Sequence, residues 1–343
     1  MCQTTSVDAS SPPKFFREVH ANCWDPSVRL AHMDASRVDI QVLSTVPVMF
    51  AYWAKPQDAY DLARLLNDHL AQVCAAAPLC GESSRRRFIP LATIPMQDPD
   101  LACAELDRCV RDLKMPGVQI GTNVNGLNLD EPGARTVLAH AAKLNACVFI
   151  HPWDMLRFGI AERPDEPARA IDRMARYWAP WLVGMPTETT LAILAILFGG
   201  VLDTSPNLRI CFAHGGGSFP GTIGRIRHGY SCRPDLFPES SRDLATYLAN
   251  YNTHNDANTS ETSPSNFNSR DHAAFWVDSL VHDASALTSL INLFSPSRIC
   301  LGSDYPFPLC EDSPGQIIRA LPNLDAHARA AMLGSSALAF LAR

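Results

Sequence analysis

Short apolar runs alternate with longer amphipathic stretches along most of the chain. The short runs are typical of buried strands, and the longer stretches carry apolar residues at helical spacings of three and four. In 56–77, for example, Leu62, Leu66, Leu70 and Val73 follow this spacing. The pattern predicts strands near residues 40, 88, 117, 147, 208, 275 and 299. It predicts helices over 27–39, 56–77, 98–113, 131–145, 187–201, 283–294, 315–321 and 325–341.

A repeated strand–helix alternation predicts an α/β fold with a parallel sheet. Seven strands are one short of a (β/α)8 barrel, and the strand that would be missing is the first. A doubly wound open sheet is the alternative, although no GxGxxG motif follows any strand. We expect residues 1–19 to form a tail and 20–343 one barrel domain, with a polar insertion over 250–271.

Composition narrows the class of protein. A net charge of -6 and a pI near 6.0 argue against a nucleic-acid-binding surface. The segment 182–202 comes nearest to a membrane span, but Glu188 and a Gly-Gly pair interrupt it. The 11 cysteines include no CxxC pair and the N-terminus has no apolar signal segment, so we expect reduced thiols in a cytoplasmic protein.

Candidate chemistry lies at three strand ends, where His151, His214 and Asp304 follow apolar runs. Active sites of parallel α/β folds lie at the carboxyl ends of the strands, so these side chains are expected to share one mouth. Two imidazoles and a carboxylate are ligand types of a catalytic divalent metal, zinc in particular. Taken singly, each of these residues is more often an ordinary hydrogen-bonding loop residue, and Gly215 to Gly217 could be only a tight turn.

Several motifs resemble those of one enzyme family. His151-Pro-Trp-Asp154, Ala213-His-Gly-Gly-Gly217 and Gly302-Ser-Asp-Tyr-Pro-Phe-Pro308 resemble motifs of the decarboxylase branch of the amidohydrolase superfamily. Within that branch the chain is similar to the aminocarboxymuconate-semialdehyde decarboxylase family. The similarity extends to Asn22-Cys-Trp-Asp-Pro26, Leu43-Ser-Thr-Val-Pro-Val-Met49, Pro116-Gly-Val-Gln-Ile-Gly121 and Trp181-Leu-Val-Gly-Met-Pro186.

The resemblance implies a (β/α)8 barrel and a zinc-dependent, non-oxidative decarboxylase. The implied substrate is 2-amino-3-carboxymuconate 6-semialdehyde, at the quinolinate branch point of tryptophan degradation by the kynurenine pathway. By motif, His151 and Asp304 match metal ligands, and His214 matches the general acid/base. Arg225 matches an arginine that reaches a substrate carboxylate across a homodimer interface, and Trp153 would line the pocket. A guanidinium suits that role because it can bind a carboxylate with two hydrogen bonds.

The chain departs from the family pattern at two places. The family's first strand carries a His-x-His pair that supplies two metal ligands, and this sequence contains no HxH. Where the family has a substrate-binding arginine before Asn-Cys-Trp-Asp-Pro, this chain has His20, a weaker partner for a carboxylate.

These departures leave three interpretations. The chain is a decarboxylase recorded without its first segment, a diverged member with a rebuilt metal site, or an inactive paralogue that binds an active subunit. A hydrolase or decarboxylase of the same superfamily acting on another small aromatic or dicarboxylic acid is a further alternative.

Overall fold

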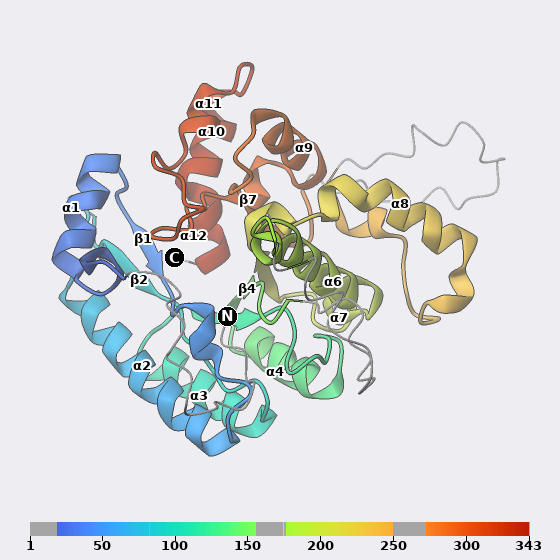
Figure 1. Cartoon of the computed structure of the whole chain (residues 1–343), viewed down its shortest axis with the longest axis horizontal. Coiled ribbons are helices and arrows are strands. Elements are labelled where there is room, and N and C mark those ends of the chain that lie inside the picture. The colour runs from blue at the N-terminus through green and yellow to red at the C-terminus, as the bar shows by residue number, and fades with distance from the viewer. Residues whose placement is uncertain (1–18, 82, 156–173, 175, 250–271, 343) are drawn as a thin grey trace.

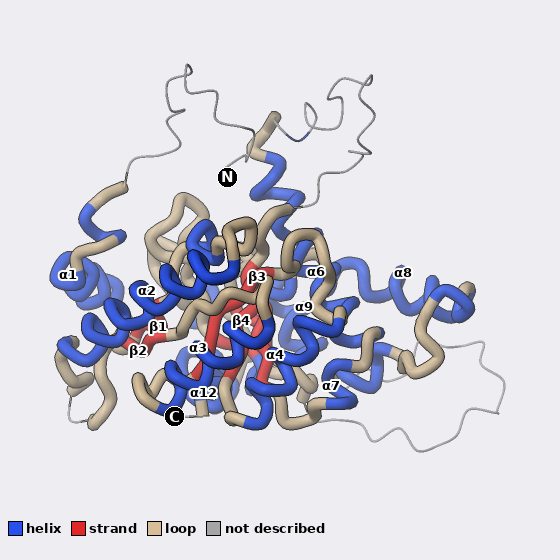
Figure 2. The backbone as a smooth tube through the Cα atoms, turned by 90° about the horizontal axis from the view of Figure 1, so that it is seen from below, coloured by secondary structure: helices blue, strands red, loops and turns tan. Residues whose placement is uncertain are grey.

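Parallel strands form the centre of the fold, and helices surround them (Figures 1 and 2). The computed structural model describes residues 19–81, 83–155, 174, 176–249 and 272–342. Within these residues lie the seven strands that the apolar runs predicted. They are β1 Gln41–Leu43, β2 Phe88–Pro90, β3 Gly117–Gly121, β4 Cys147–His151, β5 Arg209–Phe212, β6 Trp276–Asp278 and β7 Ile299–Cys300.

Most of the helices also follow the sequence pattern, with ends shifted by a few residues. They are α1 Pro26–Ser36, α2 Pro56–Ala76, α3 Pro99–Arg111, α4 Pro132–Lys143, α6 Met185–Phe198, α7 Val201–Thr204, α8 Phe219–Cys232, α9 Ala284–Phe294, α10 Gln316–Ala320, α11 Ala326–Ala330 and α12 Ser336–Leu341. Residues 1–18 of the predicted tail (1–19) lie outside the described residues, as does the whole predicted insertion (250–271).

Aspartates fix where several of these helices begin. Asp25 accepts a hydrogen bond from the Ser27 amide at 2.8 Å, and Pro26 follows it at the first helical position. Asp98, Asp283 and Asp325 cap α3, α9 and α11 in the same way. Such caps satisfy amides that the first helical turn leaves unpaired, so the helix starts are encoded locally.

The strands pair in chain order. β1 pairs with β2, and β3 to β7 form one continuous parallel sheet. A single bridge between Ala92 and Val118 joins the two sheets, where Ala92 N donates to Gly117 O at 3.0 Å. Strand order never reverses, so the fold is a barrel of the (β/α)8 class and the doubly wound alternative is wrong.

The two ends of the strand series, β1 and β7, have no strand between them in the described part of the chain. A groove of about 410 Å³ lies on that side, between α1 and the segment after β7. His32, Gln41, Tyr305 and Glu311 are among its lining residues.

Alternating strand residues divide the core into two layers. On β4, Val148 and Ile150 join the large cluster beneath the helices. Cys147 and Phe149 instead join a smaller cluster with apolar residues of β2, β5, β6 and β7. This cluster fills the inside of the ring of strands. Phe340 of α12 belongs to this cluster and its carbonyl accepts from Arg209 Nε at 2.7 Å, so α12 closes the amino-terminal end of the ring.

The apolar stretch Pro180–Phe198 has the length and mean hydropathy (1.6) of a membrane span, but 50% of it is buried inside this fold. α6, which makes up most of it, buries the polar residues Glu188 and Thr189 together with its apolar ones. The stretch is thus accounted for as a helix that packs in the core.

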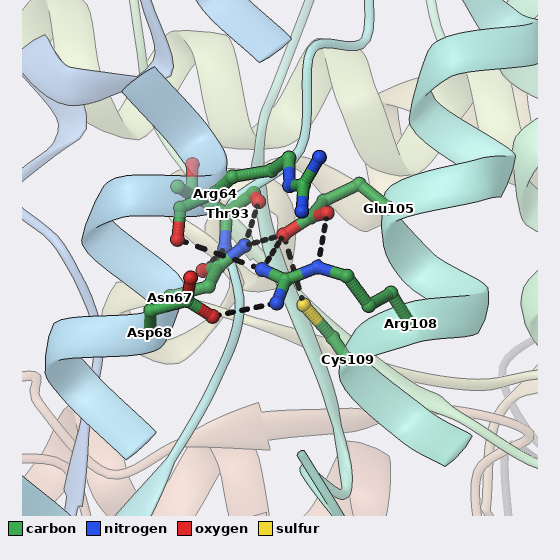
Figure 3. A network of polar contacts seen from close by, with 7 residues as sticks. All are labelled: Arg64, Asn67, Asp68, Thr93, Glu105, Arg108 and Cys109. Atoms are coloured by element: carbon green, nitrogen blue, oxygen red, sulfur yellow. Dashed lines mark hydrogen bonds and ion pairs between the residues drawn. The ribbon is translucent and has the colours of Figure 1, made fainter. Parts of the chain in front are cut away.

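A buried ionic network joins α2 to α3 (Figure 3). Glu105 is fully buried, and its carboxylate accepts from Asn67 Nδ2 at 2.7 Å and from Arg108 Nε and Nη2 at 2.9 and 2.8 Å. Asn67 also pairs with both the amide and the carbonyl of Thr93, next to β2. Cys109 Sγ donates to the same carboxylate at 3.3 Å. Every oxygen of Glu105 is therefore bonded from within the network, which fixes both helices relative to β2.

Candidate metal centre

Three side chains from distant parts of the sequence meet at the carboxyl ends of the strands. His151 is the last residue of β4, His214 follows β5, and Asp304 follows β7. One ligand atom from each lies within 4.8 Å of the other two, and all three residues are half-buried. The two imidazole rings stand edge to face, with centroids 4.9 Å apart. The strand ends thus bring together the side chains that were expected to share one mouth.

The tautomer of His151 follows from its backbone contact. Its Nδ1 lies 3.0 Å from the carbonyl oxygen of Pro152. A carbonyl only accepts, so Nδ1 carries the proton and the lone pair lies on Nε2. Burial, and then the neighbouring His214, lower the pKa of His151 to about 3. The ring is therefore neutral at pH 7 and able to bind a cation through Nε2.

His214 is held in a strained turn. Its φ is +56°, and the three following glycines have φ of +61°, +79° and +64°. A Cβ at Gly215 would lie 2.4 Å from Val281 Cγ1, and one at Gly217 would lie 2.3 Å from Pro186 O. Only glycine fits there, and left-handed backbone at a non-glycine residue is characteristic of functional sites. Burial, followed by the charge of His282, lowers the pKa of His214 to about 4.

Asp304 also has a left-handed backbone, with φ of +53°. Its carbonyl accepts from Phe307 N at 2.9 Å, which closes a turn directly after the ligand position. The next residue, Tyr305, meets His32 Nδ1 at 2.7 Å and lies beneath the guanidinium of Arg29 at 4.8 Å. Contacts with α1 therefore hold the loop that carries Asp304.

This donor set fits a divalent metal. Two neutral imidazoles and a carboxylate offer three ligands, which is the number that catalytic zinc sites use while leaving a position open. The same ligands also suit other first-row divalent ions, so the set defines a metal site without selecting the element.

Trp153 follows β4, two residues after His151. Its ring packs edge to face on Phe50 at 5.9 Å, and its backbone carbonyl accepts from Asn123 Nδ2 at 2.8 Å. The amide of Gly121 donates to Tyr52 Oη at 3.0 Å, and a Cβ on Gly121 would lie 3.1 Å from Trp153 Cβ. The position that was predicted to line the pocket is thus rigid and close to β3 and β4.

The two predicted carboxylate partners lie elsewhere. His20 is exposed and precedes a short 3-10 helix, Ala21–Cys23, at the start of the described chain. Arg225 is exposed on α8, a helix that extends away from the strands (Figure 1). Neither belongs to the group that offers ligand atoms.

The sequence reasoning missed Asp278, the last residue of β6. Its exposed fraction is 6%, and its carboxylate accepts from the amides of Gly215 and Leu280 at 2.9 and 3.0 Å. Burial raises the pKa of Asp278, while these amides and the charge of His151 oppose that rise. The signal was present: an acid at the end of a predicted strand, the same position in which His151 stands on β4.

Comparison with known proteins places the chain in a family. The family model described as Amidohydrolase matches residues 14–343. The chain is 49% identical over 329 residues to 2-amino-3-carboxymuconate-6-semialdehyde decarboxylase of Dictyostelium discoideum, covering 96% of this chain and 79% of that protein. It is 33% identical over 377 residues to the enzyme of the same name from Caenorhabditis elegans, covering 96% and 83%.

A solved structure shares the fold. It is the 5-carboxyvanillate decarboxylase of Novosphingobium aromaticivorans, complexed with manganese and 4-hydroxy-3-methoxy-5-nitrobenzoic acid. Its TM-score is 0.72 at 22% sequence identity, with 92% of this chain and 80% of that chain covered.

Proposed function

The chain belongs to the amidohydrolase family, and from this premise we propose that it is a metal-dependent, non-oxidative decarboxylase of 2-amino-3-carboxymuconate 6-semialdehyde. The observation that carries the reaction is the 49% identity to the Dictyostelium discoideum decarboxylase over 96% of the chain. The His151–His214–Asp304 cluster supplies a site at which that chemistry can occur.

His151 and Asp304 would hold the metal, and His214, whose ring nitrogen lies within 4.8 Å of their ligand atoms, would stand beside it. When bound, a divalent ion supplies a Lewis acid and lowers the pKa of a bound water. We propose zinc because the donor set suits it, with manganese as the alternative because a structural relative contains it. The neutral state of both imidazoles at pH 7 supports binding of either ion, since no proton must first be removed.

His214 is the proposed proton carrier. Loss of carbon dioxide leaves the electron pair of the broken bond on the substrate carbon, and that carbon takes up one proton in its place. An imidazole whose pKa is lowered by burial accepts a proton only transiently and returns it readily. The strained turn at 214–217 fixes where the ring presents that proton.

The substrate's carboxylates need cationic or hydrogen-bonding partners. Arg225 is the proposed partner for one of them, and its exposed place on α8 supports a role in the site of a second subunit of a homodimer. Trp153 would pack against the unsaturated chain of the substrate, and His20 would take the place of the second cationic partner.

The experiment is to remove metal with a chelator, reload with zinc or manganese, and measure carbon dioxide release together with bound metal. The proposal expects release that depends on metal and approaches one ion per chain at full activity. Metal binding with hydrolysis but no carbon dioxide would overturn the decarboxylase in favour of a hydrolase.

A second candidate rests on the missing His-x-His pair. Without that pair, the ligands in the described residues could bind the ion too weakly to act, and the chain would then serve as an inactive partner of an active subunit. Absence of bound metal after loading, together with association with an active homologous subunit, would favour this candidate.

A further inference from the structure

The strand β6 carries no candidate metal ligand, yet it lies between the two strands whose ends carry His214 and Asp304. It ends in Asp278, and Ser279 follows directly. Both residues are almost fully buried, with exposed fractions of 6% and 3%. Burying a polar side chain costs free energy unless its hydrogen bonds are made. The partners of these two side chains therefore indicate what they do.

Asp278 reaches toward β5. Its Oδ1 accepts from the amide of Gly215 at 2.9 Å and from the amide of Leu280 at 3.0 Å. Gly215 follows His214 directly in the left-handed turn. A charge-assisted hydrogen bond to that amide holds the turn in a conformation that the backbone alone disfavours.

Ser279 reaches toward β7 on the other side. Its Oγ accepts from the amide of Gly302 at 3.2 Å, and its own amide donates to Cys300 O at 2.8 Å. Gly302 lies two residues before Asp304. A Cβ on Gly302 would lie 2.8 Å from Asp278 Cβ and Cγ, so this glycine also makes room for the carboxylate.

We propose that Asp278 and Ser279 are positioning residues that set the separation between His214 and Asp304, and so the geometry in which the cluster accepts a divalent metal. Each residue ties one neighbouring strand end to β6, and the two bonds together span the site. This proposal rests on the proposed function only in requiring a bound metal. It does not require the decarboxylase activity. Outer contacts of this kind change metal affinity or activity by about 10- to 100-fold in other proteins.

The test measures zinc and manganese affinity by calorimetry on the full chain, with no substrate present. Asp278→Ala should lower the affinity about 10- to 100-fold. Asp278→Asn keeps an oxygen that can accept from Gly215 and Leu280, so it should recover most of the loss. Ser279→Ala should weaken binding by a smaller factor, because the Gly302 amide bond is longer.

Asp283→Asn is the matched control. Asp283 lies on the same loop and also accepts from a backbone amide, that of Ala286 at 2.8 Å, but it is exposed and caps α9. It should lower the melting temperature slightly and leave metal affinity unchanged. Melting of each metal-free variant separates loss of fold from loss of site geometry.

The outcomes are distinct. Wild-type affinity in folded Asp278→Ala and Ser279→Ala overturns the positioning role, as does equal weakening in Asp283→Asn. If Asp278→Ala does not fold, Ser279→Ala decides by the same comparison. A wild-type chain that binds metal but releases no carbon dioxide refutes the decarboxylase alone, whereas one that binds no metal refutes both ideas.

Discussion

Two polar clusters in the described part of the molecule are built on opposite principles. In the α2–α3 network, Glu105 accepts from Asn67, Arg108 and Cys109, so its bonding is complete within the protein (Figure 3). In the strand-end cluster, the rings of His151 and His214 stand edge to face, and ligand atoms of both lie within 4.8 Å of one from Asp304. Self-sufficient bonding marks a structural cluster, and converging side chains of metal-ligand type mark a place for a ligand.

The largest expected effect concerns the strand-end cluster. His214→Ala should lower kcat about 100- to 10,000-fold, because it removes the proposed proton carrier. Steady-state carbon dioxide release measures this, and His228→Ala, which changes an exposed histidine of α8, is the control. Near-wild-type kcat in His214→Ala would remove this residue from the chemistry.

Next comes the structural cluster. Glu105→Ala should lower the free energy of unfolding by about 3–5 kcal/mol, since it leaves Arg108 and Asn67 without their buried acceptor. Denaturant unfolding measures this, while kcat of the folded fraction should not change. The control, Asp235→Ala, breaks an exposed pair with Arg233 and should change stability little. Loss of kcat in folded Glu105→Ala would break the distinction between the clusters.

Arg225 belongs to neither cluster, and it tests whether the site extends across subunits. Arg225→Ala should raise KM about 10- to 100-fold, the loss expected from one charged hydrogen-bonded contact, with metal content unchanged. Substrate saturation curves and metal analysis measure the two quantities. A fall in bound metal would contradict the assignment to substrate binding.

The pH dependence of stability should come from the strand-end cluster, with a smaller effect than the substitutions above. Folding lowers the pKa of His151 to about 3 and that of His214 to about 4, from the usual 6.5. At pH values between the lowered and the usual pKa, each histidine is more protonated in the unfolded chain than in the folded one. Their contribution is therefore constant above pH 6.5, and stability falls as pH drops from 6.5 toward 4. The slope is at most about 1.4 kcal/mol per pH unit for each histidine.

Unfolding of the metal-free protein at a series of pH values checks this. The double variant His151→Gln, His214→Gln should flatten the slope, whereas Cys109→Ala should keep it. An unchanged slope in the double variant would assign the acid sensitivity to other groups.

The smallest effect lies in the structural cluster. Cys109→Ala removes one weak donor from a carboxylate that keeps three others, so the free energy of unfolding should fall by about 1 kcal/mol or less. Denaturant midpoints measure it, with Cys232→Ala, an exposed cysteine, as the control. A loss as large as that of Glu105→Ala would mean that the network is not redundant.

The apolar runs and helical spacings predicted the strands and most helices, because burial and periodicity are local properties of the sequence. His151, His214 and Asp304 could be predicted to meet, because parallel strands end at one edge. Their roles as ligands and proton carrier remain predictions. Asp278 could have been noticed as an acid at a strand end, but its bond to the remote amide of Gly215 could not be predicted. The role of Glu105 could not be predicted either, because its partner Asn67 lies on a second helix.

The glycine turn after β5 constrains how this scaffold can diversify. Because Gly215 and Gly217 are walled in by Val281 and Pro186, no side chain can be added there to recognise a new molecule. A change in what the site recognises would therefore have to use residues other than these two glycines.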